Sequence, residues 1–320
     1  MSAENRSEWA VTAAATGAPL LLWGCGASWL WLLAGGLLAV ACCTPVLRGR
    51  ETVPQLLRCT LGKRVGTGVL WLQLASLALG AGWLLRRAGG IVPNVTHGGP
   101  WIPLVIMLLA LAGAWRGRKA ALASGAVLFW LILLTVGVVA VCSLPQIRWE
   151  RIQPVGGIGQ VLPAAAMFLL PMLAVCAKKP DEKQNAWKLP GAITASAVAV
   201  AAITAGCLSP RLAATESLPF FTLAASCRLL GHAARFDAVL CMTVTAALYC
   251  LLVLMLNFCR QLSETEKQGP LLVFSVLALL CAWWAPVVPV GITGGCLVVL
   301  WGILPAYCAI CEKRKKNAKK

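Results

Sequence analysis

The sequence predicts an all-α protein that crosses a membrane about ten times. Of its 320 residues, 59% are apolar and only 12% are charged, whereas a soluble domain has roughly 45–50% apolar and about 25% charged residues. The apolar residues form runs of about 20, the length of a helix that spans a hydrocarbon core of about 30 Å. This composition excludes a water-soluble globular enzyme, a disordered chain and an ordinary nucleic-acid-binding protein.

Clusters of charged residues, proline and glycine separate the apolar runs and set the ends of each predicted helix. A short segment at 218–230 has the pattern of a partly buried helix between spans seven and eight. The stretch 9–45 fits either one long span or two spans joined around Gly24 and Gly26. With two spans there, the ten helices lie at 9–24, 26–45, 63–87, 99–116, 119–143, 156–177, 190–208, 236–259, 270–286 and 288–310.

The basic residues predict the orientation of the spans, because cytoplasmic loops carry an excess of Lys and Arg. With the N-terminus inside, the inner segments hold 21 of the 28 basic residues and the outer segments hold 7. The net charge of +17 therefore indicates two cytoplasmic termini rather than nucleic-acid binding. We expect a short tail at 1–8, one transmembrane domain at 9–311 and a basic tail at 312–320 that touches anionic membrane lipid.

Glycine and proline inside two of the spans predict breaks in those helices. Span one contains Thr-Gly-Ala-Pro at 16–19, and span six contains two glycines at 156–157 and two prolines within 163–171. Such breaks free backbone groups that then line a cavity, and matching breaks in two halves are typical of a midplane binding site. The alternative is that the prolines and glycines serve only helix packing, and spacing alone does not decide between the two.

The residues that carry chemistry in enzymes are missing from the predicted spans. All 11 carboxylates fall in loops, tails or the first residues of a span, so a proton relay through the membrane is not expected. Cys308 and Cys311 have the spacing of a metal-binding pair, but a zinc site needs further ligands that are not nearby. We therefore predict no enzymatic activity, no catalytic residue, no metal and no cofactor.

Three stretches carry a family resemblance. At 51–66 an amphipathic run is followed by a Leu-Gly-Lys-x-x-Gly element, and at 149–171 a Pro-Val pair leads into span six. At 218–237 a Pro-x-x-x-Leu-Ala segment is followed by Arg-x-Asp at the start of span eight. In order and spacing these stretches resemble the endospore germination permeases. These are the B-subunits of nutrient germinant receptors, within the amino acid–polyamine–organocation transporter superfamily.

The resemblance implies two inverted five-helix repeats, at about 9–143 and about 156–310, with spans one and six broken. It implies a pocket between spans one, three, six and eight, where freed N–H groups at half-helix starts attract a ligand carboxylate. No carboxylate is available to pair with a cationic side chain, so a neutral ligand is favoured. By position, the lining residues are Thr16, Gly17, Ala18, Gln73, Ala165, Ala166, Met167, Phe168, Thr243 and Thr245.

The same resemblance places Arg235 and Asp237 at the outer edge of span eight, where we interpret them as a structural pair with Glu216 in the same surface network. It implies a subunit of a germinant receptor in the cell membrane, specifically the spore inner membrane. This subunit would bind a small neutral nutrient, such as an amino acid, and signal to other receptor subunits. Two alternatives stay open: an amino-acid transporter of the same fold, and a non-sensing structural subunit whose pocket has collapsed.

Overall fold

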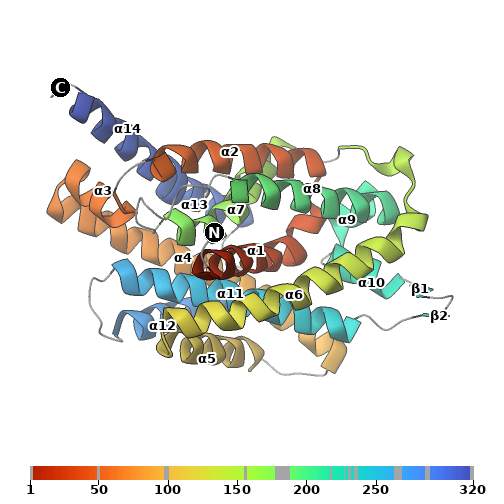
Figure 1. The fold of residues 1–320 in the computed structure, drawn as a ribbon. Helices are drawn as coiled ribbons and strands as arrows, with labels where there is room; N and C mark the ends of the chain where they lie inside the picture. The colour runs from red at the N-terminus through yellow and green to blue at the C-terminus, as the bar shows by residue number, and fades with distance from the viewer. Residues whose placement is uncertain are drawn as a thin grey trace.

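The helices run roughly along one common direction and pack side by side in a computed structural model of the chain (Figure 1). The structure describes residues 3–48, 51–96, 101–154, 157–176, 188–216, 218–226, 228–229, 232–233, 237–262, 269–284 and 289–317. A helix occupies each of the ten ranges that the sequence predicts. These helices are α1 (Ala3–Leu22), α2 (Trp29–Arg48), α4 (Lys63–Thr96), α5 (Ile102–Trp115), α6 (Arg118–Ser143), α7 (Val161–Cys176), α8 (Lys188–Leu208), α11 (Asp237–Leu262), α12 (Gly269–Trp284) and α13 (Val290–Leu297), which continues into α14 (Leu304–Asn317).

Shorter elements connect the long helices. The amphipathic segment near residue 51 forms α3 (Val53–Leu61). Within the segment 218–230, which the sequence predicts to be a helix, α10 covers only Pro219–Ser226, and a strand occupies Arg228–Leu229. The short helix α9 (Pro210–Thr215) precedes α10. Two strands, β1 (Arg228–Leu229) and β2 (His232–Ala233), pair in an antiparallel hairpin after α10.

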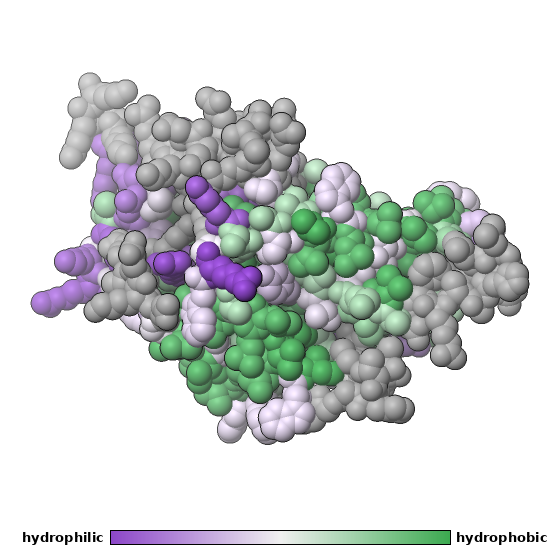
Figure 2. All heavy atoms as spheres, turned by 60° about the horizontal axis from the view of Figure 1, so that its bottom comes forward, coloured by the Kyte–Doolittle hydropathy of each residue, from purple (hydrophilic) through white to green (hydrophobic). Residues whose placement is uncertain are grey.

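Six helices of the described chain are long and apolar enough to cross a membrane, judged by length and composition. Three shorter apolar helices accompany them, among them α5 and α12. Hydrophobic side chains cover much of the surface shown in Figure 2, as expected of helices that face lipid. The chain therefore has the helices of a multi-pass membrane protein, while ten crossings and the inverted repeats stay predictions.

The stretch 9–45 forms two helices rather than one. The helix α1 ends at Leu22, a 3₁₀ turn follows at Gly24–Gly26, and α2 begins at Trp29. Glycine is needed at Gly26, because a Cβ atom there would lie 3.0 Å from the carbonyl oxygen of Ala213 in α9. The turn thus brings the start of α2 against the α9 segment.

The helix α1 occupies the middle of the bundle, with α6, α7 and α11 packed around it (Figure 1). Its first residue is Ala3, so Glu8 lies in the second turn of the helix and not in a polar tail. The Glu8 side chain is only 7% exposed. The Glu8 carboxylate is therefore more buried than the sequence predicts. The prediction from hydropathy starts the helix at residue 9 and leaves Glu8 in the tail.

Candidate functional site

The predicted break in the first span does not occur, because α1 continues without interruption through residues 16–19. The hydroxyl of Thr16 donates to the carbonyl of Thr12, at 2.9 Å, within the same helix. A Cβ atom on Gly17 would lie 3.4 Å from Ile132 in α6 and 3.5 Å from Ala247 in α11. Gly17 and the fully buried Ala18 therefore serve close packing between helices. The single N–H that proline lacks does not unwind the helix in this packed setting.

The predicted break in the sixth span is also absent from the described residues. A 3₁₀ turn at Ile158–Gln160 leads directly into α7, and the helix then runs unbroken from Val161 to Cys176. Pro163 falls in the first turn of α7, where the N–H that proline lacks has no partner within the helix. Pro163 is therefore compatible with the first turn of α7 and does not break the helix.

The alanine-rich part of α7 is a packing surface. Ala165, Ala166, Met167 and Phe168 are all buried, with exposures between 0% and 4%. A Cβ atom on Gly35 of α2 would lie only 2.7 Å from the backbone nitrogen of Ala165. The small residues let the two helix backbones approach each other, and α7 presents no freed N–H group there.

Two of the predicted polar lining residues, Gln73 and Thr243, donate hydrogen bonds to backbone carbonyls, whereas the buried Oε1 of Gln73 has no hydrogen-bond partner among the described residues. The Gln73 side chain is fully buried, and its Nε2 donates to the carbonyl of Leu300 at 2.7 Å. Leu300 lies in a π-helical segment, Val298–Ile303, between α13 and α14. The Thr243 hydroxyl donates to the carbonyl of Val239, one turn earlier in α11, at 2.8 Å, and Thr245, two residues further on, is half-buried.

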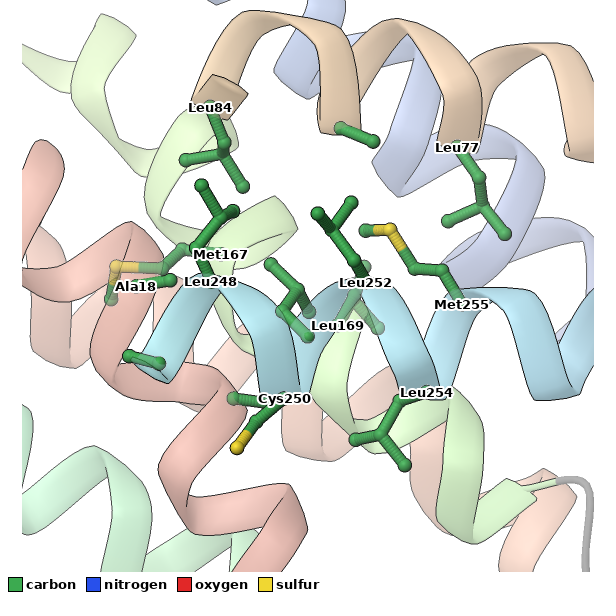
Figure 3. Close-up of a cluster of buried hydrophobic side chains, with 14 of the residues drawn as sticks. Ala18, Leu77, Leu84, Met167, Leu169, Leu248, Cys250, Leu252, Leu254 and Met255 are labelled. Atoms are coloured by element: carbon green, nitrogen blue, oxygen red, sulfur yellow. The ribbon is translucent and has the colours of Figure 1, made fainter. Parts of the chain in front are cut away.

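Apolar side chains fill the space where the sequence predicts a ligand. Figure 3 shows Ala18 and Met167, both predicted lining residues, in one buried cluster with Leu77, Leu248 and Leu252. These side chains come from α1, α4, α7 and α11, the four spans named for the pocket. The structure therefore brings the four predicted helices together, but their apolar side chains pack against one another and fill the space between them.

A small cavity of about 50 Å³ lies at one end of this region, between α1, α4, α7 and α13. Of the predicted residues, only Ala166 and Met167 line it. The other lining residues come from the end of α1 and the residue after it, the middle of α4, the first turn of α7 and the whole length of α13. They are Pro19, Trp23, Gly80, Trp83, Leu84, Pro163, Val290, Thr293, Gly294 and Leu297.

The end of α1 is tied to α4 beside this cavity. The Arg87 Nε donates to the carbonyl of Leu22, the last residue of α1, at 3.1 Å. The guanidinium carbon of Arg87 lies 5.2 Å from the ring centroid of Trp83, which itself lines the cavity. No role was predicted for either residue from the sequence. The neighbouring Arg86 side chain is exposed. A signal for Trp83 and Arg87 was available in the sequence: positions 73, 76, 80, 83 and 87 are spaced by three or four residues and therefore share one face of α4.

The cavity is uncharged, because no acidic or basic side chain is among its lining residues. Glu8 is eleven residues from Pro19 on the same helix, which corresponds to about 16 Å along the helix axis. Among the described residues, no group of three or more His, Cys, Asp or Glu side chains could hold a metal ion. The arrangement is thus suited to an apolar or neutral solute.

The predicted structural network lies mostly outside what the structure describes. Glu216 follows α9 and caps it through its backbone N–H, which donates to the carbonyl of Leu212 at 2.9 Å. Asp237 is the first residue of α11. Arg235 is outside the described residues, so the Arg235–Asp237 pair stays a prediction.

Two solved structures are similar to the chain over nearly its whole length. One is a Na⁺-coupled sialic acid symporter in a substrate-bound, outward-open state. It has a TM-score of 0.65 and 12% sequence identity, and the match covers 94% of this chain and 78% of the symporter. The other is MhsT in complex with L-phenylalanine. It has a TM-score of 0.63 and 14% identity, and the match covers 97% of this chain and 88% of MhsT.

No protein-family model and no curated protein matches the sequence. Identities of 12% and 14% show a shared fold and nothing finer. The germination-permease resemblance and the wider superfamily that it implies accordingly stay predictions. The chain is an all-α, multi-pass membrane protein that shares its fold with these two solved structures.

Proposed function

We propose that this protein is a membrane transporter for a small neutral solute, such as an amino acid with an apolar side chain. The observation that carries the proposal is the uncharged cavity between α1, α4, α7 and α13, in a chain that shares its fold with a protein solved in complex with L-phenylalanine. Two tryptophans and two prolines line the cavity, and such surfaces suit an apolar side chain. This proposal is the transporter alternative that the sequence left open.

The described conformation is a closed one in this proposal. A cavity of about 50 Å³ has room for about one water molecule, whereas small-molecule pockets usually measure about 300–1,000 Å³. A solute must therefore bind better to a more open arrangement of the same helices and shift the equilibrium toward it. The hydrogen bond from Arg87 to the carbonyl of Leu22 holds the closed arrangement, since it joins α4 to α1 beside the cavity. Trp83, one turn earlier on α4, packs against the same guanidinium group.

Uptake of L-phenylalanine into proteoliposomes, with and without a Na⁺ gradient, tests this proposal. The Gly80→Leu variant places a side chain in the cavity, and its Cβ would meet only the flexible end of Leu297, at 3.3 Å. The matched control is Gly68→Leu on the same helix, where a Cβ atom would meet nothing within 4 Å. We expect saturable uptake by the wild type and by the control, and loss of uptake in Gly80→Leu. Equal uptake by all three would remove the cavity from the mechanism.

A germinant-receptor subunit in a spore membrane is the second candidate function. The motif resemblance at 51–66, 149–171 and 218–237 supports it, and so does the side-chain cluster that closes the centre of the bundle. This candidate expects amino-acid binding, seen as a rise in thermal stability, without uptake, and co-purification with other receptor subunits. A chain that shows neither uptake nor binding would instead be the structural subunit.

A further inference from the structure

We propose that the ends of α2, α4 and α14 form a binding surface for the headgroups of anionic phospholipids. Six exposed basic side chains, called the basic end here, lie at the last residue of α2, the first two residues of α4 and the last turns of α14. They are Arg48, Lys63, Arg64, Lys313, Arg314 and Lys315. Figure 2 shows hydrophilic side chains gathered at one end of the molecule, beside a hydrophobic surface.

The helix α3 lies between these segments, of which Arg48 and Lys315 are 267 residues apart in the sequence. It packs against both α4 and α14. A Cβ atom on Gly66 of α4 would lie 2.9 Å from the Cα of Arg58 in α3, so the two backbones are in close contact. On the other side, α3 is in contact with α14. The positions of the basic residues are thus set by packed helices and not by a free tail.

Exposed apolar side chains continue from each basic run along the same helix. On α4, Val65 is 59% exposed and Trp71 is 56% exposed. On α14, Tyr307 is 61% exposed and Ile310 is 45% exposed. Trp71 follows Lys63 by about 12 Å along the helix axis, and Tyr307 precedes Lys313 by about 9 Å. The basic residues would face the headgroup of a phospholipid. The exposed aromatic and aliphatic residues, further along the same helices, would face its acyl chains.

This combination favours a lipid over an acidic protein. An acidic protein segment needs only the charges, whereas a phospholipid also covers the exposed apolar surface beside them. Each Lys or Arg near an anionic membrane surface contributes about 1 kcal/mol, equivalent to about fivefold in affinity. Two such residues on one helix are therefore expected to account for about 25-fold.

The test uses the full-length protein in neutral detergent and fluorescent analogues of phosphatidylglycerol and phosphatidylcholine. Binding is measured by fluorescence anisotropy at two salt concentrations. The variants are the double substitution Lys63→Gln with Arg64→Gln and, independently, Lys313→Gln with Arg314→Gln. The control is Arg116→Gln with Lys119→Gln, which removes the same charge from exposed positions at the α5–α6 connection, outside the ends of α2, α4 and α14 that make up the basic end. All six positions are exposed, so each variant is expected to fold.

We expect the wild type to bind phosphatidylglycerol more tightly than phosphatidylcholine, with an affinity that falls as salt rises. Each test variant should lose about 25-fold in phosphatidylglycerol affinity, while the control changes less than about twofold. Equal binding of the two lipids would overturn the proposal. The proposal would also be overturned if the control variant lost as much phosphatidylglycerol affinity as the test variants, because the loss would then depend on net charge alone. Tighter binding of a poly-glutamate peptide than of phosphatidylglycerol would assign the surface to an acidic protein instead.

Discussion

Replacing Gly35 by alanine is expected to force α2 and α7 apart. The added Cβ would lie 2.5 Å from the Cβ of Ala164 and 2.7 Å from the backbone nitrogen of Ala165. These distances are about 1 Å shorter than an optimal contact of about 3.5–4.0 Å. Because a backbone atom is involved, rotation of a side chain cannot relieve the contact, and the helices must move.

The size of the effect follows from two opposing terms. Overpacking a well-packed interface costs about 1–3 kcal/mol. The exchange of glycine for alanine within a helix gains up to about 1 kcal/mol. We therefore expect a net loss of about 1–2 kcal/mol in the free energy of unfolding. At Gly137 in α6 a Cβ atom would meet nothing within 4 Å, so Gly137→Ala keeps only the favourable term and should be neutral or stabilising.

The assay is the midpoint of thermal unfolding of the purified protein in detergent, followed by size-exclusion chromatography of the heated samples. Gly35→Ala should unfold below the wild type, and Gly137→Ala at or above it. Adding Ala164→Gly to the Gly35→Ala variant should recover part of the loss, since the Cβ at 2.5 Å is then gone while the contact at 2.7 Å persists. The reasoning is refuted if Gly35→Ala is as stable as Gly137→Ala.

Three further substitutions test the candidate site. Gln73→Leu leaves the carbonyl of the partly buried Leu300 without its amide donor and should destabilise by about 1–3 kcal/mol. Hydrogen exchange across 298–303 should rise, and unchanged exchange would contradict the assignment. Arg87→Gln should lower the unfolding midpoint by the equivalent of about 1–2 kcal/mol, whereas the exposed neighbour Arg86→Gln should change it little; equal effects of the two would argue against the α1–α4 contact. Thr16→Val removes a hydroxyl that bonds only its own helix, so amino-acid uptake should be unchanged, and a large loss of uptake would restore Thr16 to the binding site.

The positions of the helices could be predicted from the sequence, since each depends on a local run of apolar residues. The charges and prolines that end such runs are local too, and a helix lies at each of the ten predicted ranges. The breaks could not be predicted, because Gly17 and Pro163 have the same local pattern whether a helix unwinds or packs closely. Gly17 faces α6 and α11, and Pro163 falls in the first turn of α7.

The candidate site shows the same division. Composition alone indicated a membrane protein, because few charges occur within the apolar runs. The binding region for a neutral ligand was a prediction from the family resemblance and the lack of carboxylates within the spans. The role of Gln73 depends on Leu300, a residue 227 positions away in the sequence. The cavity likewise exists only where four helices meet, and Trp83 lines it through its position on α4. The burial of an apolar run in lipid depends only on consecutive residues, so it can be predicted from the sequence. Contacts between distant helices depend on how backbones and side chains fit in space, and only the tertiary structure decides them.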